Sequence, residues 1–189
     1  DAETMMARDQ FGHVLALRPF MGVMGMPPGE PGVHPTAPPR ATGGNLDCKE
    51  LVAGSTLYLP VEVQGGLFST GDGHGLQGDG EVSTTAIECP MDRVTLTFDV
   101  RSDMKISTPH ANTPAGWVTM GVHEDLQEAT MSALSAMLDL MMQELKVERL
   151  EALALASLVV DLHVTQIVNG VRGVHAIWPH GVIGRDGSL

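Results

Sequence analysis

The sequence predicts an α+β fold in which mainly antiparallel, β-sandwich-like sheets are combined with two helices in the second half. Apolar residues alternate with period two in the first half, as along half-buried strands. After residue 126 they recur every three or four positions, as on one face of a helix. Short turns separate the expected strands, and such turns join antiparallel neighbours. We expect a single domain over residues 1–189.

The first half is expected to consist of strands and loops. One or two short strands lie within residues 14–24, and residues 27–44 form a Pro/Gly-rich arm, because proline fixes φ and lacks a backbone donor. The period-two run at 57–63 contains Pro60, which favours an edge strand or a bulge. Further strands are expected from residue 67, over 81–88 and over 94–100.

Residues 122–160 form the expected helical segment, with one helix from Leu126 and a second from about Val147 to Leu158. The acidic residues just before the first helix suit the positive end of its dipole. The turn signal Asn169-Gly170 then separates two runs of β-forming residues, which we expect to pair antiparallel.

Composition and charge exclude several classes of function. The 189 residues carry a net charge of −12, which argues against binding to nucleic acid or to an anionic membrane surface. Charged residues interrupt the apolar region 126–160, so it cannot span a bilayer. Two cysteines are too few for a disulfide framework, and we expect reduced thiols and a cytoplasmic location.

The glycine-rich segment 71–81 holds most of the candidate functional side chains. Because it contains so few apolar residues, we expect it to bury little surface. Imidazole and carboxylate groups serve as metal ligands and as general acids or bases. In an extended chain, side chains two residues apart point to the same side. Such pairs of side chains in this segment could together form a metal site of nitrogen and oxygen ligands. The alternative is a solvated acidic hairpin. The polar members are Asp72, His74, Gln77, Asp79 and Glu81.

Two motif interpretations of this segment fail. Residues 73–78 match G-x-G-x-x-G, but a dinucleotide site requires a helix directly afterwards, and residues 82–87 favour a strand. The spacing of acids also differs from the calcium loop of an EF-hand.

A series of longer motifs resembles the acetamidase/formamidase family of amidohydrolases, through nearly the whole chain. The motifs are RPFMGVMG at 18–25, GGNLD at 43–47, AGSTLYLPV at 53–61, GLFSTGDGH at 66–74, QGDGE at 77–81, TAIE at 85–88 and VDLHVTQIVN at 160–169. The resemblance implies a β-sandwich-like fold with associated helices, a metal at the active site and hydrolysis of short aliphatic amides to carboxylate and ammonia. It also implies that the chain is the C-terminal part of a longer enzyme, whose missing N-terminal segment would be a partner.

For this chemistry we expect Asp72 and His74 to bind the metal, and Glu81 to act as general base and then as proton donor. Asp79 is expected to be a ligand or to orient the histidine, and Asn45 to bind the amide substrate. The histidine favours zinc over calcium, which is the alternative ion.

Other functions remain open from sequence alone. A γ-lactam-opening hydrolase of the same family is one alternative, and a non-enzymatic metal-binding β-sandwich module is another. A cysteine nucleophile (Cys48 or Cys89) or a serine nucleophile (Ser69 or Ser83) lacks a recognisable sequence context. The methionines at 131, 137 and 141 share a helical face, which leads us to expect a homo-oligomer.

Overall fold

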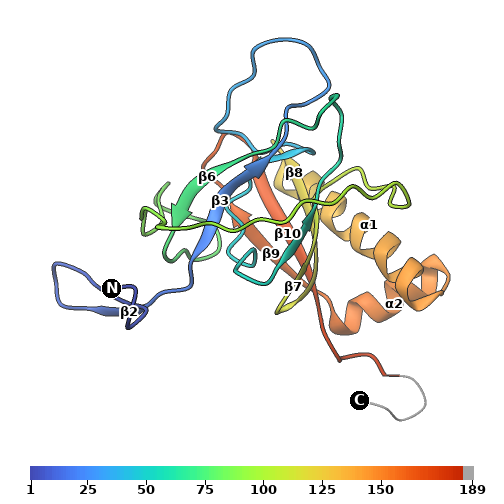
Figure 1. Cartoon of the computed structure of the whole chain (residues 1–189). Coiled ribbons are helices and arrows are strands. Elements are labelled where there is room, and N and C mark those ends of the chain that lie inside the picture. Colours follow the sequence, from blue (N-terminus) through green and yellow to red (C-terminus); the bar gives the residue numbers. More distant parts are fainter. Residues whose placement is uncertain (185–189) are drawn as a thin grey trace.

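The structure, a computed structural model, describes residues 1–184, within which ten strands form three sheets and two helices pack on one of them (Figure 1). Every pair of neighbouring strands in these sheets is antiparallel, so the predicted α+β class is confirmed. The sheet orders are β1-β2, β4-β3-β6 and β5-β7-β8-β10-β9. The strands are β1 (Met6–Arg8), β2 (Val14–Ala16), β3 (Phe20–Gly25), β4 (Gly43–Asn45), β5 (Thr56–Tyr58), β6 (Ser69–His74), β7 (His110–Thr113), β8 (Gly116–His123), β9 (Asp161–Gln166) and β10 (Arg172–Pro179).

The helices α1 (Leu126–Leu145) and α2 (Arg149–Val159) cover one face of the five-stranded sheet (Figure 1). The side chain of Asp125 caps α1 by accepting hydrogen bonds from two backbone amides of the first turn. Alternate residues of β10 point at this helix layer and join its apolar core. These are Val174, Ala176 and Trp178.

The opposite face of the five-stranded sheet packs against the three-stranded sheet. Val118 and Met120 of β8 and Ile177 of β10 form a second core with Met24 of β3 and the segment 46–51. The two sheets thus form the expected sandwich, with the helices outside it. By alternation along β10, His175 points to the same side as Ile177, away from the helices.

Two expected strands are absent from the structure. Residues 94–100 form no strand, and their alternating apolar side chains are exposed, up to 86% for Val100. Residues 81–84 form a turn rather than a strand, and only Glu88 of 81–88 makes an isolated bridge. Period two in a sequence marks an extended chain, but a strand also needs a partner with free backbone groups.

The expected edge position of the run at 57–63 is confirmed, although the strand is shorter. Strand β5 ends at Tyr58 and pairs on one side only, with β7. Strand β3, in contrast, has hydrogen-bonded neighbours on both sides. Among residues 1–184 the structure contains no helix that is both long and apolar enough to cross a membrane.

Candidate metal and active site

Two groups of histidines and carboxylates are arranged as metal ligands would be. We call the first the His74 cluster; it consists of Asp47, Asp72, His74, Glu81 and Glu88. We call the second the His175 group; it consists of Asp79, His163 and His175. The His74 cluster contains two triads, Asp47–His74–Glu81 and Asp72–His74–Glu88. In each of them, and in the His175 group, the candidate ligand atoms lie within 4.8 Å of one another.

The orientation of His74 is fixed by a chain of hydrogen bonds. Its Nδ1 atom lies 2.9 Å from Oε1 of Gln77, and Nε2 of Gln77 donates to the backbone carbonyl of Asp47 at 2.7 Å. Because the amide group of Gln77 is held in this direction, its oxygen faces the ring and Nδ1 must be the donor. The Nε2 atom of His74 is therefore left free to accept a proton or a metal ion.

This free nitrogen faces two carboxylates. The Nε2 atom of His74 lies 3.3 Å from Oδ1 of Asp72, its neighbour on β6, and 3.3 Å from Oε2 of Glu88. An isolated bridge between the backbones of His74 and Glu88 brings the glutamate to this position. One imidazole nitrogen and two carboxylates form a set of donors that suits a divalent cation.

Asp47 and Glu81 form the buried end of the cluster. Both are less than 8% exposed, and both adopt positive φ angles, 50° and 44°, which few non-glycine residues do. Burial, followed by the charges of Glu81 and Asp72, raises the pKa of Asp47 to about 8. Burial likewise raises the pKa of Glu81. At neutral pH the carboxyl group of Asp47 therefore holds a proton.

Two carboxyl oxygens of this pair, Oδ1 of Asp47 and Oε2 of Glu81, are buried without a hydrogen-bond partner in the described chain. Buried polar atoms are nearly always paired, so these oxygens indicate a place for a proton, a water, a metal ion or a substrate. The opposing backbone supports this interpretation. A Cβ atom on Gly22 of β3 would lie 2.8 Å from Oδ1 of Asp47, 2.9 Å from Oδ2 of Asp72 and 2.9 Å from Cε1 of His74. Glycine at this position leaves the cluster its space.

The structure brings together some of the residues expected from sequence and separates others. Asp72, His74 and Glu81 lie in one cluster, and its donors fit a divalent ion. Asp79 lies outside this cluster. Its carboxylate accepts a hydrogen bond from the ammonium of Lys49 at 2.8 Å and lies 3.0 Å from Nδ1 of His163.

The role expected for Asn45 stays a prediction. Its side-chain nitrogen donates to the carbonyl of Ala37 at 3.1 Å, and its Oδ1 atom is buried without a partner in the described chain. In addition, His74 is 1% exposed and packs edge-on against Phe20, with ring centroids 5.1 Å apart, although its glycine-rich surroundings suggested little burial. The buried surface comes from β3, which is distant in sequence.

Sequence reasoning missed three members of the site. Asp47 and Asn169 belong to segments that resembled only turns, yet Nδ2 of Asn169 donates to Oδ2 of Asp47 at 2.6 Å. Glu88 lies in a run expected to be a plain strand. The signal available was the recurrence of acidic residues within several of the family-like motifs, since Asp47 ends one motif and Glu88 ends another.

Cys48 does not fit the role of a nucleophile in the structure. Cys48 is fully buried, and burial raises its pKa to about 12, so the thiolate is absent at neutral pH. Cys89 is also a free thiol.

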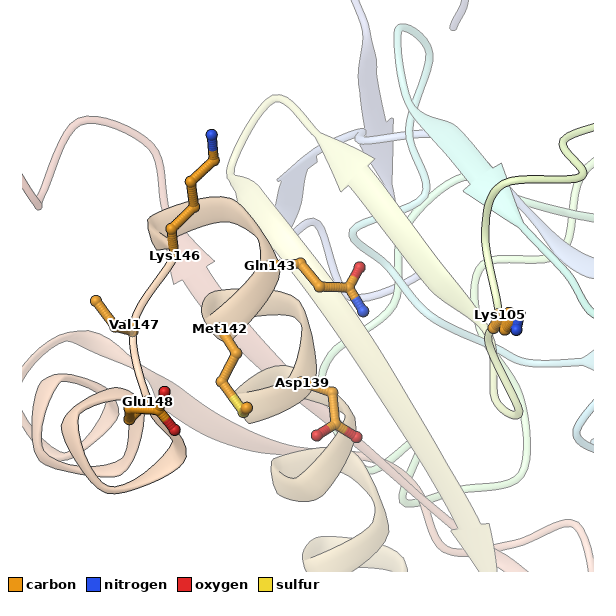
Figure 2. Close-up of a pocket in the computed structure, with 7 residues that line it drawn as sticks. All are labelled: Lys105, Asp139, Met142, Gln143, Lys146, Val147 and Glu148. Atoms are coloured by element: carbon orange, nitrogen blue, oxygen red, sulfur yellow. The ribbon is translucent and has the colours of Figure 1, made fainter.

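A separate hollow lies beside the end of α1, with Asp139 and Gln143 on the helix and Lys105 on the facing loop (Figure 2). Its lining contains no member of either histidine group.

Fold and site together define an α+β protein with a mixed imidazole–carboxylate centre between packed sheets. Residues 29–178 match the model of the Acetamidase/Formamidase family, and the chain belongs to this family.

Individual relatives match the chain over short stretches. A formamidase of Methylophilus methylotrophus is 54% identical over 48 residues, which are 25% of this chain and 12% of the relative. An acetamidase of Mycolicibacterium smegmatis is 50% identical over 48 residues, again 25% and 12% of the two chains.

Solved structures show the same fold over most of the chain. The acetamidase of Bacillus halodurans superposes with a TM-score of 0.80 at 29% identity, over 91% of this chain and 58% of that one. The acetamidase of Yersinia enterocolitica gives a TM-score of 0.81 at 25% identity, over 92% and 52%. The chain thus spans a little more than half the length of these solved relatives.

Proposed function

We propose that the protein hydrolyses short amides of the formamide and acetamide type to a carboxylate and ammonia, at the His74 cluster. The family and the names of the relatives support the choice of substrate. The observation that carries the chemistry is the buried Asp47–Glu81 pair, which belongs to the same cluster as His74 and has two carboxyl oxygens without a hydrogen-bond partner in the described chain.

Amide hydrolysis needs a base for the attacking water and an acid for the leaving nitrogen. In this proposal the carboxylate of Glu81 takes the proton from water as it attacks the carbonyl carbon. The protonated carboxyl of Asp47 gives its proton to the nitrogen as the carbon–nitrogen bond breaks. The raised pKa values of both groups suit this exchange near neutral pH.

The donors also fit a divalent ion. Asp72, His74 and Glu88 would hold it, because Nε2 of His74 faces both carboxylates and its other nitrogen is fixed by Gln77. When bound, such an ion polarises the substrate carbonyl and lowers the pKa of water. The imidazole favours zinc or a similar transition metal over calcium.

The proposal is tested by ammonia release from formamide and acetamide, before and after chelation and zinc addition. The assay is run on the chain by itself and on any longer polypeptide that contains it. Glu81→Gln should lower kcat by roughly 10² or more. The matched control is Glu144→Gln on the exposed side of α1. Absence of ammonia from every amide, or full activity in Glu81→Gln, would contradict the proposal.

A further inference from the structure

The His175 group lies outside the site assigned above. His163 and His175 stand opposite one another on the neighbouring strands β9 and β10. Asp79 reaches them from the loop that follows β6, and one candidate ligand atom of each residue lies within 4.8 Å of the other two. Two imidazoles and one carboxylate form a ligand set with which proteins bind zinc while leaving one position open.

His175 has a nitrogen that the protein leaves unused. The residue is 0% exposed; its Nδ1 atom lies 2.7 Å from Oγ1 of Thr165, and its Nε2 atom has no partner in the described chain. When Nδ1 donates to Thr165, Nε2 keeps its lone pair. A hydrogen bond at one nitrogen and a free lone pair at the other is the usual arrangement of a metal-binding histidine.

The loop that carries Asp79 is fixed to β9 by backbone hydrogen bonds. The amide of Gly80 donates to the carbonyl of Thr165 at 3.0 Å, and the amide of Ile167 donates to the carbonyl of Gly80 at 3.1 Å. Asp79 therefore stays next to β9, and its approach to the two histidines results from the fold rather than from a mobile side chain.

His163 and the neighbouring Lys49 are more accessible than His175 and have room to move. The ammonium of Lys49 is 2.8 Å from Oδ2 of Asp79 and its side chain is 26% exposed, so it can turn into solvent. The side chain of His163 is 34% exposed. Its ring stacks on His175 with centroids 5.0 Å apart and planes 7° apart. Because a metal ion lies in the plane of each imidazole that binds it, the ring of His163 must turn when an ion enters.

We propose that Asp79, His163 and His175 bind a divalent transition-metal ion of the zinc class, separate from any ion at the His74 cluster. The ion ties β9 and β10 to the loop that leads into Glu81. Lys49 competes with it for Asp79. Calcium is excluded as the preferred ion, because two imidazoles are poor partners for a hard cation.

The test is the zinc content of purified, chelator-treated protein after equilibrium dialysis against Zn²⁺, with elemental analysis. His163→Ala and His175→Gln should each lose one zinc per chain, and His74→Ala should retain that zinc. His34→Ala is the control for surface histidines; its ring bonds the carbonyl of Glu30, and its zinc content should equal that of the wild type. His163 is partly exposed, so its variant remains informative if the buried His175 variant fails to fold.

This outcome is independent of the proposed catalytic site, because it concerns the zinc that remains in His74→Ala. A zinc content that His163→Ala and His175→Gln leave unchanged would overturn the second site, as would the absence of bound zinc from His74→Ala.

Affinity measurements on two further variants probe the arrangement of the group. Thr165→Val keeps the side-chain shape but removes the hydrogen bond to His175, and it should weaken zinc binding roughly 10–100-fold. Lys49→Met removes the competing charge and should tighten binding by roughly tenfold. Unchanged affinity in both variants would overturn the assignment of the ion to this group.

Discussion

Asn169 and Asp47, 122 positions apart in the sequence, are joined by a hydrogen bond of 2.6 Å from Nδ2 of the first to Oδ2 of the second. The bond links the turn between β9 and β10 to the His74 cluster. Because it favours the ionised carboxylate, it lowers the pKa of Asp47, whereas burial and the neighbouring acids raise it to about 8. Asn169 is therefore a positioning residue that acts through Asp47.

The first prediction concerns this bond. Asn169→Ala should raise the pKa of Asp47 above about 8. If Asp47 acts as the proton donor, activity falls as pH rises through its pKa, and the variant should move this alkaline limb to higher pH. The measurement is kcat against pH. Asn112→Ala is the control, since Asn112 bonds His180 away from the cluster. A limb that stays in place would contradict the role of Asp47.

The second prediction concerns the space at Gly22. Gly22→Ala introduces a methyl group within 3 Å of three cluster side chains, so Asp47, Asp72 and His74 must shift. We expect loss of zinc at this cluster and a fall in kcat/KM of roughly tenfold or more, because a small displacement of catalytic groups is costly. Gly71→Ala on strand β6 is the control, since its added methyl group meets nothing within 4 Å. Equal effects of the two substitutions would contradict the interpretation.

The third prediction concerns stability and pH in chelated protein. The folded pKa of Asp47, about 8, exceeds the ordinary value of 3.8, so the native state holds a proton that the unfolded chain releases. The stabilisation from this group is complete below pH 4 and is lost as pH rises through about 8. Asp47→Asn, which tolerates the positive φ, should remove this part of the slope. Urea unfolding of both proteins between pH 4 and pH 9 measures the difference; parallel curves would contradict it.

The fold class could be predicted because its signals are local. Period two at 57–63, period 3.6 after Leu126 and the Asn169-Gly170 turn each depend on neighbouring residues. The position of the acidic Asp125 before α1 and the pairing of β9 with β10 follow from the same local signals. The prediction of a strand at 94–100 was wrong, because a sequence shows whether a segment can be extended but not whether another strand will pair with it.

The geometry of the site could be predicted most directly where it lies within one strand. Asp72 and His74 are two apart on β6, and their contact follows from the pleat. Asp79 and Glu81 are also two apart, but a turn with positive φ at Gly80 and Glu81 directs them to different groups. The contributions of Asp47 and Asn169 depend on contacts across the sandwich, which no local pattern contains.

The fourth prediction concerns Cys48. Because the thiol is fully buried and its pKa is raised to about 12, it cannot serve as a nucleophile. Cys48→Ala should keep kcat within about twofold, while the small cavity lowers the free energy of unfolding by about 1 kcal/mol. Ammonia release and urea unfolding check both effects. Loss of activity in a stably folded Cys48→Ala protein would restore the cysteine mechanism.

The last prediction separates stability from metal binding at His74. His74 is 1% exposed, packs against Phe20 and bonds Gln77. His74→Ala therefore leaves a cavity and an unpaired buried amide oxygen, and it should destabilise the protein by about 2–4 kcal/mol even in chelator.

The measurement is urea unfolding of wild type and variant, each with and without Zn²⁺. If His74 binds zinc, adding zinc should stabilise His74→Ala less than it stabilises the wild type. This difference comes in addition to the lower free energy of unfolding of the variant in chelator. The matched variant Gln77→Leu removes the hydrogen bond to Nδ1 but keeps the ring, and so should weaken zinc binding roughly 10–100-fold rather than abolish it. An equal gain from zinc in all three proteins would show that His74 only packs the core.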